Sequence, residues 1–314
     1  MVGVLIGRAI LFAVVSVALA SAGTPARAGE GLAALGIRVE LLPGAATAEF
    51  PETASLRPSG DALPDGTFAI GLHDIAGAWL VAPTTRYDHA VLGDAIEAGG
   101  LRVRLRDGRE LDYRLPPNSV FEDLRPRVAD LDGDGRDEIV VVRSYLDAGA
   151  ALAVYGVRDG EIVHLAETEP IGVPYRWLNP AGIGDLDGDG GLEIAYVETP
   201  HIGGILHVLS YDGERLHREG RLPGFSNHAM GSRALGLSAV LDLDGDGAQE
   251  LILPAAGRRK LRIVSLAGGT FRELGGIEHH AAIVTDFQVR DRNGNGRPDI
   301  AYGLADGTLV ALLR

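Results

Sequence analysis

The sequence contains no cysteine among its 314 residues. This excludes a disulfide framework, a thiolate metal site, a cysteine nucleophile and a lipid-anchoring cysteine. Aromatic residues make up only 5% of the chain, and lysine occurs once, at Lys260, so arginine carries almost all of the positive charge. The formal net charge of −14 argues against a nucleic-acid-binding protein, because such proteins present a basic surface to phosphate groups.

Long apolar runs are lacking beyond the N-terminus. The first run, residues 9–20, follows Arg8 and precedes two small-residue sites, Ala20–Ala22 and Ala26–Ala28. A basic flank, about a dozen apolar residues and an A-x-A site are typical of a secretory signal peptide. A membrane anchor is the alternative, although the run is short for a transmembrane span. We therefore expect a signal peptide over residues 1–28 and a periplasmic or secreted protein without integral membrane contact.

Four acidic segments repeat along the rest of the chain. They begin at Asp130, Asp185, Asp242 and Asp291, which lie 55, 57 and 49 residues apart. Each segment has Asp or Asn at positions 1, 3 and 5, Gly at positions 4 and 6, and Asp or Glu at position 9. A strand-like apolar run follows each segment, and Asp-Gly turns between later alternating runs predict hairpins. Helix signals are essentially absent.

The repeat predicts an all-β fold. Units of four antiparallel strands that recur about every 54 residues are typical of β-propeller blades. The length predicts five blades, with six or seven left open, and a β-sandwich is the alternative. Since the last unit holds only three strands, we expect an N-terminal strand, residues 37–42 or 67–72, to supply the fourth and close the ring. The expected domains are an N-terminal strand with a Pro/Ala/Gly-rich linker over 29–66, and a propeller over 67–314.

The first blade is expected to have diverged from the others. Its strands are predicted at Val91–Asp94, Leu101–Arg106 and Glu110–Leu115. Residues 84–88, which lack the spacing of the acidic segments, are interpreted as the remnant of its acidic loop.

The acidic segments have the chemistry of calcium loops. Calcium takes six to eight oxygen ligands at ~2.3–2.6 Å, and alternate side chains of a tight loop can converge on one ion. An EF-hand is excluded because position 12 holds no carboxylate and no helices flank the loops. Polar turns without metal are the alternative. We expect up to four structural Ca²⁺ ions, bound least tightly in the fourth loop, where Asn293 and Asn295 replace two aspartates.

These segments, for example Gly184–Gly190 with the apolar run to Val197, resemble FG-GAP (VCBS-type) repeats. The resemblance spans roughly residues 80–314 and implies a β-propeller like that of integrin α subunits and many secreted bacterial proteins. It also implies that each calcium loop joins the first and second strands of a blade. The implied ligands are Asp130, Asp132, Asp134 and Glu138; Asp185, Asp187, Asp189 and Glu193; Asp242, Asp244, Asp246 and Glu250; and Asp291, Asn293, Asn295 and Asp299.

A second site is expected at the opposite end of the blades. In a four-stranded blade the 1–2 and 3–4 connections share one end, and the remaining connections share the other. Loops at this other end bring together residue types that typically form a ligand pocket. The candidates are Arg176, Trp177, Asn179, His201, Asn227, His228 and Arg233, together with His279 and His280. The alternative is that these side chains anchor their own loops.

The sequence predicts an exported calcium-binding propeller that acts as a binding or scaffold module for a protein or small ligand, with no nucleic-acid partner. The alternative is a hydrolase or lyase in which His201 or His228 is the general base and Arg176 or Arg233 holds an anion. No nucleophile elbow, HExxH motif or phosphate loop supports catalysis. A propeller that binds a redox cofactor is disfavoured, because the sequence lacks the tryptophan-docking repeat of quinoproteins. Enzymatic activity therefore stays open.

Overall fold

The computed structural model describes residues 31–46 and 60–314. The predicted signal peptide and most of the predicted linker lie outside these residues. The described chain is built from antiparallel strands, with two short 3₁₀ turns, η1 (Ala256–Arg258) and η2 (Ala267–Gly269). Among the described residues, no helix is long and apolar enough to cross a membrane. The prediction of an all-β fold is confirmed.

Three sheets each contain four antiparallel strands, and strands that follow one another in the sequence are neighbours, except that β1 pairs with β20 in the third sheet. The first contains β10 (Leu178–Gly184), β11 (Glu193–Glu198), β12 (Ile205–Tyr211) and β13 (Leu216–Pro223). The second contains β14 (Ala239–Leu241), β15 (Glu250–Pro254), β16 (Lys260–Ser265) and β17 (Arg272–Glu278). The third contains β18 (Gln288–Arg290), β19 (Asp299–Gly303), β20 (Leu309–Leu313) and the N-terminal β1 (Arg38–Leu42).

The remaining strands form one larger sheet with two halves. One half holds β2 (Ile75–Thr84), β3 (Glu97–Leu105) and β4 (Glu110–Arg114). The other holds β6 (Arg127–Ala129), β7 (Glu138–Tyr145), β8 (Gly149–Arg158) and β9 (Glu161–Glu167). The short β5 (Ser119–Phe121) joins them, because it pairs with β7 over its whole length and with β3 at a single position. Each half therefore resembles one repeat unit.

The N-terminal strand completes the last sheet. β1 pairs antiparallel with β20 from Arg38 opposite Leu313 to Leu42 opposite Leu309. The other candidate segment, residues 67–72, instead meets β2 through an antiparallel bridge between Ala69 and Ala78. Of the two predicted positions, 37–42 thus supplies the fourth strand of the last unit.

The first unit differs from its prediction. Val91–Asp94 forms a turn rather than a strand, because Gly93 has a φ of +103° and the buried Val91 and Leu92 anchor a loop between β2 and β3. Thr84 ends β2 and residues 85–88 belong to the same connection, so this segment is not the remnant of an acidic loop. The equivalent position is occupied by residues 71–74, between the Ala69 bridge and β2.

Apolar clusters fill the space between neighbouring sheets. Leu206 and Val208 of β12, for example, share a cluster with Leu251 and Leu253 of β15. Since a middle strand such as β7 is covered on both faces, the whole run Ile139–Val142 is buried. This explains why the runs after the acidic segments are continuously apolar instead of alternating.

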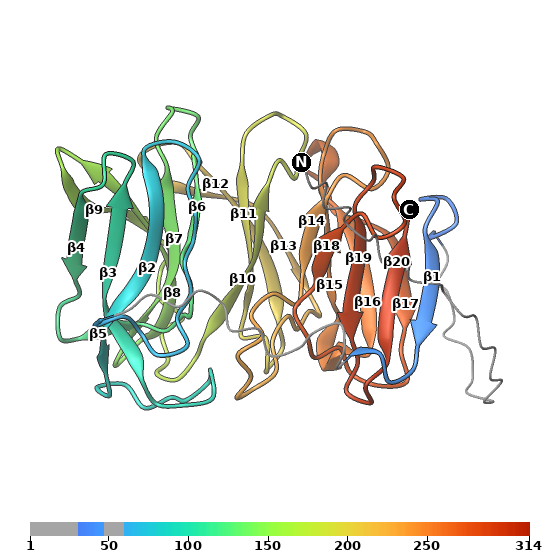
Figure 1. Cartoon of the computed structure of the whole chain (residues 1–314), viewed down its shortest axis with the longest axis horizontal. Coiled ribbons are helices and arrows are strands. Elements are labelled where there is room, and N and C mark those ends of the chain that lie inside the picture. Colours follow the sequence, from blue (N-terminus) through green and yellow to red (C-terminus); the bar gives the residue numbers. More distant parts are fainter. Residues whose placement is uncertain (1–30, 47–59) are drawn as a thin grey trace, which may run out of the picture.

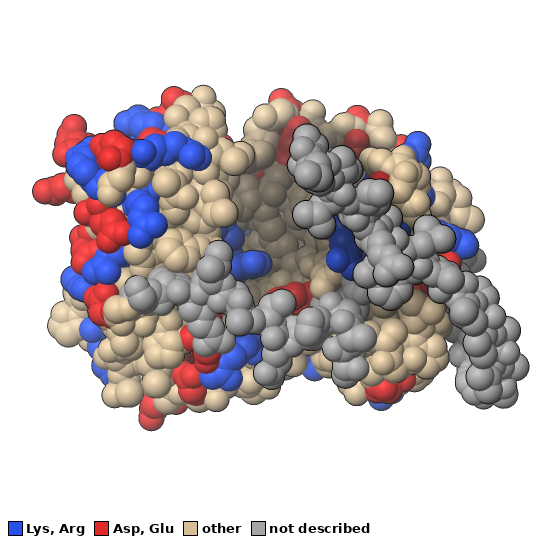
Figure 2. All heavy atoms as spheres, in the orientation of Figure 1, with Lys and Arg blue, Asp and Glu red and all other residues tan. Residues whose placement is uncertain are grey.

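The strands run alongside one another, with their connections gathered at two ends (Figure 1). Figure 2 shows this face hollowed between the half that contains β2 and the half that contains β18. A small cavity of about 90 Å³ is lined by Arg127 of β6, Gly182 of β10 and Ser238, which precedes β14. The arrangement leaves two separate sets of loops in which a site can form.

Candidate functional site

The four acidic segments form loops between β6 and β7, β10 and β11, β14 and β15, and β18 and β19. Glycine is required within them, since Gly133 and Gly135 have φ values of +73° and +85°. In the first loop, Oδ2 of Asp130 accepts a hydrogen bond from the backbone N–H of Gly135 at 3.0 Å. The equivalent bond is present in the second and fourth loops. In these loops the carboxylate of the first residue thus holds the backbone of the sixth residue.

The ninth-position carboxylate lies beneath each loop. Glu138 Oε2 accepts the N–H of Leu131 at 3.0 Å, and the third and fourth loops repeat this bond from Leu243 to Glu250 and from Arg292 to Asp299. The second loop repeats it from Leu186 to Glu193 at 2.7 Å. All four acceptor residues are buried. Burial raises the pKa of Glu138, Glu193 and Glu250 to about 7 in each case.

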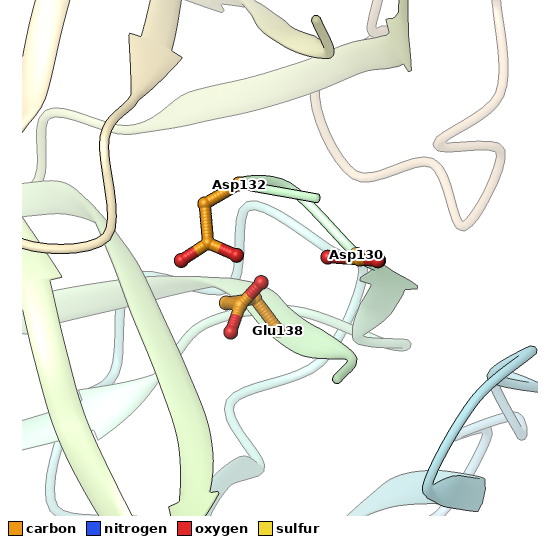
Figure 3. Close-up of side chains that lie close together, drawn as sticks. All are labelled: Asp130, Asp132 and Glu138. Atoms are coloured by element: carbon orange, nitrogen blue, oxygen red, sulfur yellow. The ribbon is translucent and has the colours of Figure 1, made fainter. Parts of the chain in front are cut away.

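In three loops the carboxylates converge. Each group offers one oxygen per residue, with the oxygens within 4.8 Å of one another: Asp130, Asp132 and Glu138; Asp185, Asp187 and Glu193; Asp242, Asp244 and Asp246. Figure 3 shows the carboxylates of Asp132 and Glu138 facing each other, with Asp130 beside them. Oδ1 of Asp130 and Oε1 of Glu250 are buried without a hydrogen-bond partner among the described residues. An all-oxygen donor set with orphaned oxygens fits a hard cation such as Ca²⁺.

Several predicted ligands lie outside these groups. Asp134 pairs with Arg136, whose Nη2 lies 2.6 Å from its Oδ2, and this pairing lowers the pKa of Asp134. Asp189 is not part of the second group, and Glu250 is not part of the third. In the fourth loop the side-chain amides of Asn293 and Asn295 donate to the carbonyl oxygen of Arg314. The fourth loop is therefore held to the C-terminus, which Figure 1 marks.

At the other end of the strands, four loops enclose a cavity of about 190 Å³. These loops connect β2 with β3, β9 with β10, β11 with β12, and β13 with β14. They are the connections that the propeller interpretation places away from the acidic loops. The cavity is lined by His89, Tyr175, Arg176, Trp177, Thr199, His201, Ile202 and Met230.

The structure brings together only some of the predicted residues of this second site. Arg176, Trp177 and His201 line the cavity. The buried side-chain amides of Asn179 and Asn227 donate to backbone carbonyls of each other's segments, so they anchor loops. The other three lie elsewhere: Arg233 pairs with Asp65 and Asp94, His279 contacts the hydroxyl of Tyr302, and His280 contacts Asp306.

His228 lies directly behind His201. Nε2 of His201 is 2.9 Å from Nδ1 of His228, and Nε2 of His228 is 2.9 Å from the carbonyl oxygen of Ser232. Because a carbonyl only accepts, His228 carries its proton on Nε2, and His201 then donates from its own Nε2. Burial lowers the pKa of both rings to about 4. At neutral pH both rings are therefore uncharged.

A second histidine arrangement, which the sequence did not predict, lies at the same cavity. Nδ1 of His89 lies 2.7 Å from Oε1 of Glu122, and the hydroxyl of Ser144 donates to the other oxygen of Glu122. Glu122 is fully buried, and burial raises its pKa, against the opposing effect of His89. His89 and Glu122 are 33 residues apart in irregular loops, so no motif or periodicity signals their contact.

Comparisons with known proteins bear on the acidic loops. The family model described as FG-GAP-like repeat matches residues 123–196. The chain contains an FG-GAP-like repeat. No curated protein matches the chain.

Solved structures with similar folds have low identity to this chain. The exotype rhamnogalacturonan lyase YesX is 17% identical, with 85% of this chain and 49% of that chain covered and a TM-score of 0.45. The rhamnogalacturonan lyase PL11 of Bacillus licheniformis is 16% identical, with 79% and 49% covered and a TM-score of 0.45. Sqt1 of Saccharomyces cerevisiae is 12% identical, with 80% and 59% covered and a TM-score of 0.45. The chain thus spans about half the length of the two lyases.

The matched FG-GAP-like repeat includes the first two acidic loops and the strands around them. The third and fourth loops lie outside the match, yet their ninth-position carboxylates accept the same backbone hydrogen bond. The backbone hydrogen bond to the ninth-position carboxylate therefore recurs in four loops of the described chain.

Proposed function

We propose that this chain is an exported, calcium-binding β-propeller that acts as a binding module. Its five blades would be residues 67–114, 127–167, 178–223, 239–278 and 288–313, with β1 as the fourth strand of the last blade. The pairing of β1 with β20 supports ring closure, because it places a strand that precedes the first blade in the sheet of the last blade. The match of residues 123–196 to the FG-GAP-like repeat supports the propeller fold.

The calcium part of the proposal rests on the acidic loops. The three convergent carboxylate groups would hold one Ca²⁺ each, and the fourth loop would hold another more weakly. A bound divalent cation supplies positive charge to carboxylates that otherwise repel one another. The raised pKa of Glu138, Glu193 and Glu250 supports this, since buried carboxylates without a cation are costly to ionise.

The binding part of the proposal rests on one observation, the cavity at the opposite end. Aromatic, basic and apolar side chains from four different loops line it, as is typical of a ligand site. Ile202 and Met230 at this cavity are 62% and 61% exposed, which is unusual for large apolar side chains. A protein or a small molecule would bind here, away from the metal loops.

A pull-down from periplasmic extract, with and without chelator, tests the binding role. Ile202→Ser should reduce the captured ligand at least fivefold, because it removes exposed apolar surface at the cavity. The matched control is Leu72→Ser, which changes an 81% exposed leucine at the other end of the strands and should capture as much as the wild type. Equal capture by both variants would place the binding surface elsewhere.

The second candidate function is a hydrolase or lyase at the same cavity. The observation that favours it is the orientation of His89 by the buried Glu122, since a carboxylate-oriented histidine beside a cavity is a candidate general base. Glu122→Gln would then abolish turnover of a substrate found by pull-down while leaving its binding intact. Unchanged turnover in that variant would exclude His89 as a base oriented by Glu122.

A further inference from the structure

A second cavity adjoins the one described above. It measures about 250 Å³ and shares His201 and Met230 with its neighbour. Its other wall is formed by the connection between β15 and β16, which includes Gly257 and Arg258. We refer to the two cavities together as the paired cleft.

The paired cleft is lined by basic and neutral residues. The chain has 43 acidic and 29 basic residues, yet no aspartate or glutamate of the described residues lines either cavity. Arg176 lines one cavity and Arg258 the other. The pKa of His201 is lowered to about 4, by burial and then by the charge of Arg258, so His201 is uncharged at neutral pH. Arg176 and Arg258 supply positive charge to the cleft. Such a lining favours an anion.

Arg258 is held in place without a counter-ion. Its Nη1 donates to the carbonyl oxygen of His228 at 3.0 Å and to the hydroxyl of Ser226 at 3.3 Å. Its Nε–H is buried and has no hydrogen-bond partner, and no carboxylate of the described residues pairs with it. A positioned guanidinium that lines a cavity without a counter-ion among the described residues is suited to a planar oxyanion, since the fork of arginine matches a carboxylate.

The backbone around the paired cleft is strained. Arg258, Thr199 and Tyr175 have φ values of +56°, +47° and +58°. Non-glycine residues in this region, above all β-branched ones such as threonine, cost free energy and cluster at ligand sites. Three of the seven described non-glycine residues with positive φ thus line this one cleft.

We propose that the paired cleft binds a carboxylate attached to an apolar or aromatic group. Arg258 would hold the carboxylate, and the exposed side chains of Ile202 and Met230 would cover the apolar part. Nδ1 of His201, which the hydrogen bond to His228 leaves without a proton, would accept a hydrogen bond from a donor on the ligand. This inference rests on the proposed binding function and names the ligand class of that site.

Ligand-observed NMR titrations with two acid–amide pairs test the proposal. The probes are benzoate and benzamide, and N-acetylphenylalanine with its primary amide. We expect each acid to bind the wild-type protein at least tenfold more tightly than its amide. Tighter binding of N-acetylphenylalanine than of benzoate would assign the carboxylate to a peptide C-terminus, and the reverse order to a free acid. Equal binding of acid and amide would overturn the proposal.

Arg258→Gly provides the matching variant, because glycine tolerates the positive φ at this position. It should weaken binding of the acids at least fivefold and leave binding of the amides unchanged. Arg259→Gln, which changes the exposed neighbouring arginine, is the control and should bind as the wild type does. Acid binding that is unaffected by Arg258→Gly would also overturn the proposal. If Ile202→Ser reduces ligand capture while acids and amides bind alike, the binding function stands and only the carboxylate assignment fails.

Discussion

The carboxylate of Asp137 accepts a hydrogen bond from the backbone N–H of Ile75, although the two residues are 62 positions apart. The same carboxylate also accepts the N–H groups of Leu72 and His73. Asp137 is the eighth residue of the first acidic loop and is fully buried. The loop of the second unit therefore holds the turn of the first unit, which has no acidic loop of its own.

Asp137→Ala should destabilise the protein by about 2–4 kcal/mol, because three backbone donors would lose a charged acceptor. Urea unfolding of the mature chain measures this. Asp147→Ala, at an exposed aspartate in the connection between β7 and β8, is the control and should change the free energy of unfolding by less than about 0.5 kcal/mol. Similar stabilities of the two variants would show that the first turn does not depend on Asp137.

Glu97→Gln should stabilise the protein at pH 7. Glu97 is buried, and its Oε1 has no hydrogen-bond partner in the described part of the chain. Burial, followed by the charge of Glu122, raises its pKa to about 9. The contribution of the protonated Glu97 carboxyl to stability is therefore fully present below about pH 4.5 and is lost as the pH rises toward 9. At pH 7 the free energy of unfolding of Glu97→Gln should exceed that of the wild type by about 1–3 kcal/mol.

Urea unfolding at pH 5, 7 and 9 checks the Glu97 prediction. The advantage of Glu97→Gln over the wild type should grow with pH, whereas Glu161→Gln, at an exposed position of β9, should show no such trend. An advantage that is the same at all three pH values would contradict the raised pKa.

His207→Phe should reduce the sensitivity of the protein to acid. His207 stacks on Tyr196 with ring centroids 4.9 Å apart, and burial, followed by Arg218 and Arg221, lowers its pKa to about 4. Because the unfolded chain takes up this proton near pH 6.5, stability is lost as the pH falls from about 6.5 to 4. Phenylalanine keeps the stacked ring but cannot be protonated. The difference in Tm between pH 4.5 and pH 7.5 should be smaller for the variant than for the wild type. An unchanged difference would show that protonation of His207 does not cause the acid sensitivity.

The parts of the structure that were predictable depend on contacts close in sequence. Each ninth-position carboxylate bonds a backbone group seven residues earlier, so one segment contains the whole loop. The place of β1 in the last sheet followed from a missing strand in an otherwise regular repeat. The first unit was misassigned because its turn at residues 71–74 depends on Asp137 rather than on local acidic residues.

The second site was predictable only as a region. Strand order placed Trp177 and His201 at the correct end of the molecule, but hydrogen bonds decide which side chains reach the cavity. Asn179 and Asn227 satisfy backbone groups instead. The contact of His89 with Glu122 joins two loops without regular structure, so no sequence pattern predicts it.

Thermal unfolding in EDTA and in millimolar calcium tests the central claim most directly, namely that the acidic loops hold calcium in the folded protein. An ion that binds only the folded chain stabilises it by about 2.7 kcal/mol per site at a hundredfold excess over Kd. Calcium should therefore raise the Tm by several degrees, magnesium should do so much less, and Asp187→Ala should reduce the calcium effect more than Asn293→Ala. Unfolding curves that coincide in EDTA and in calcium would contradict the account and leave the loops as polar turns.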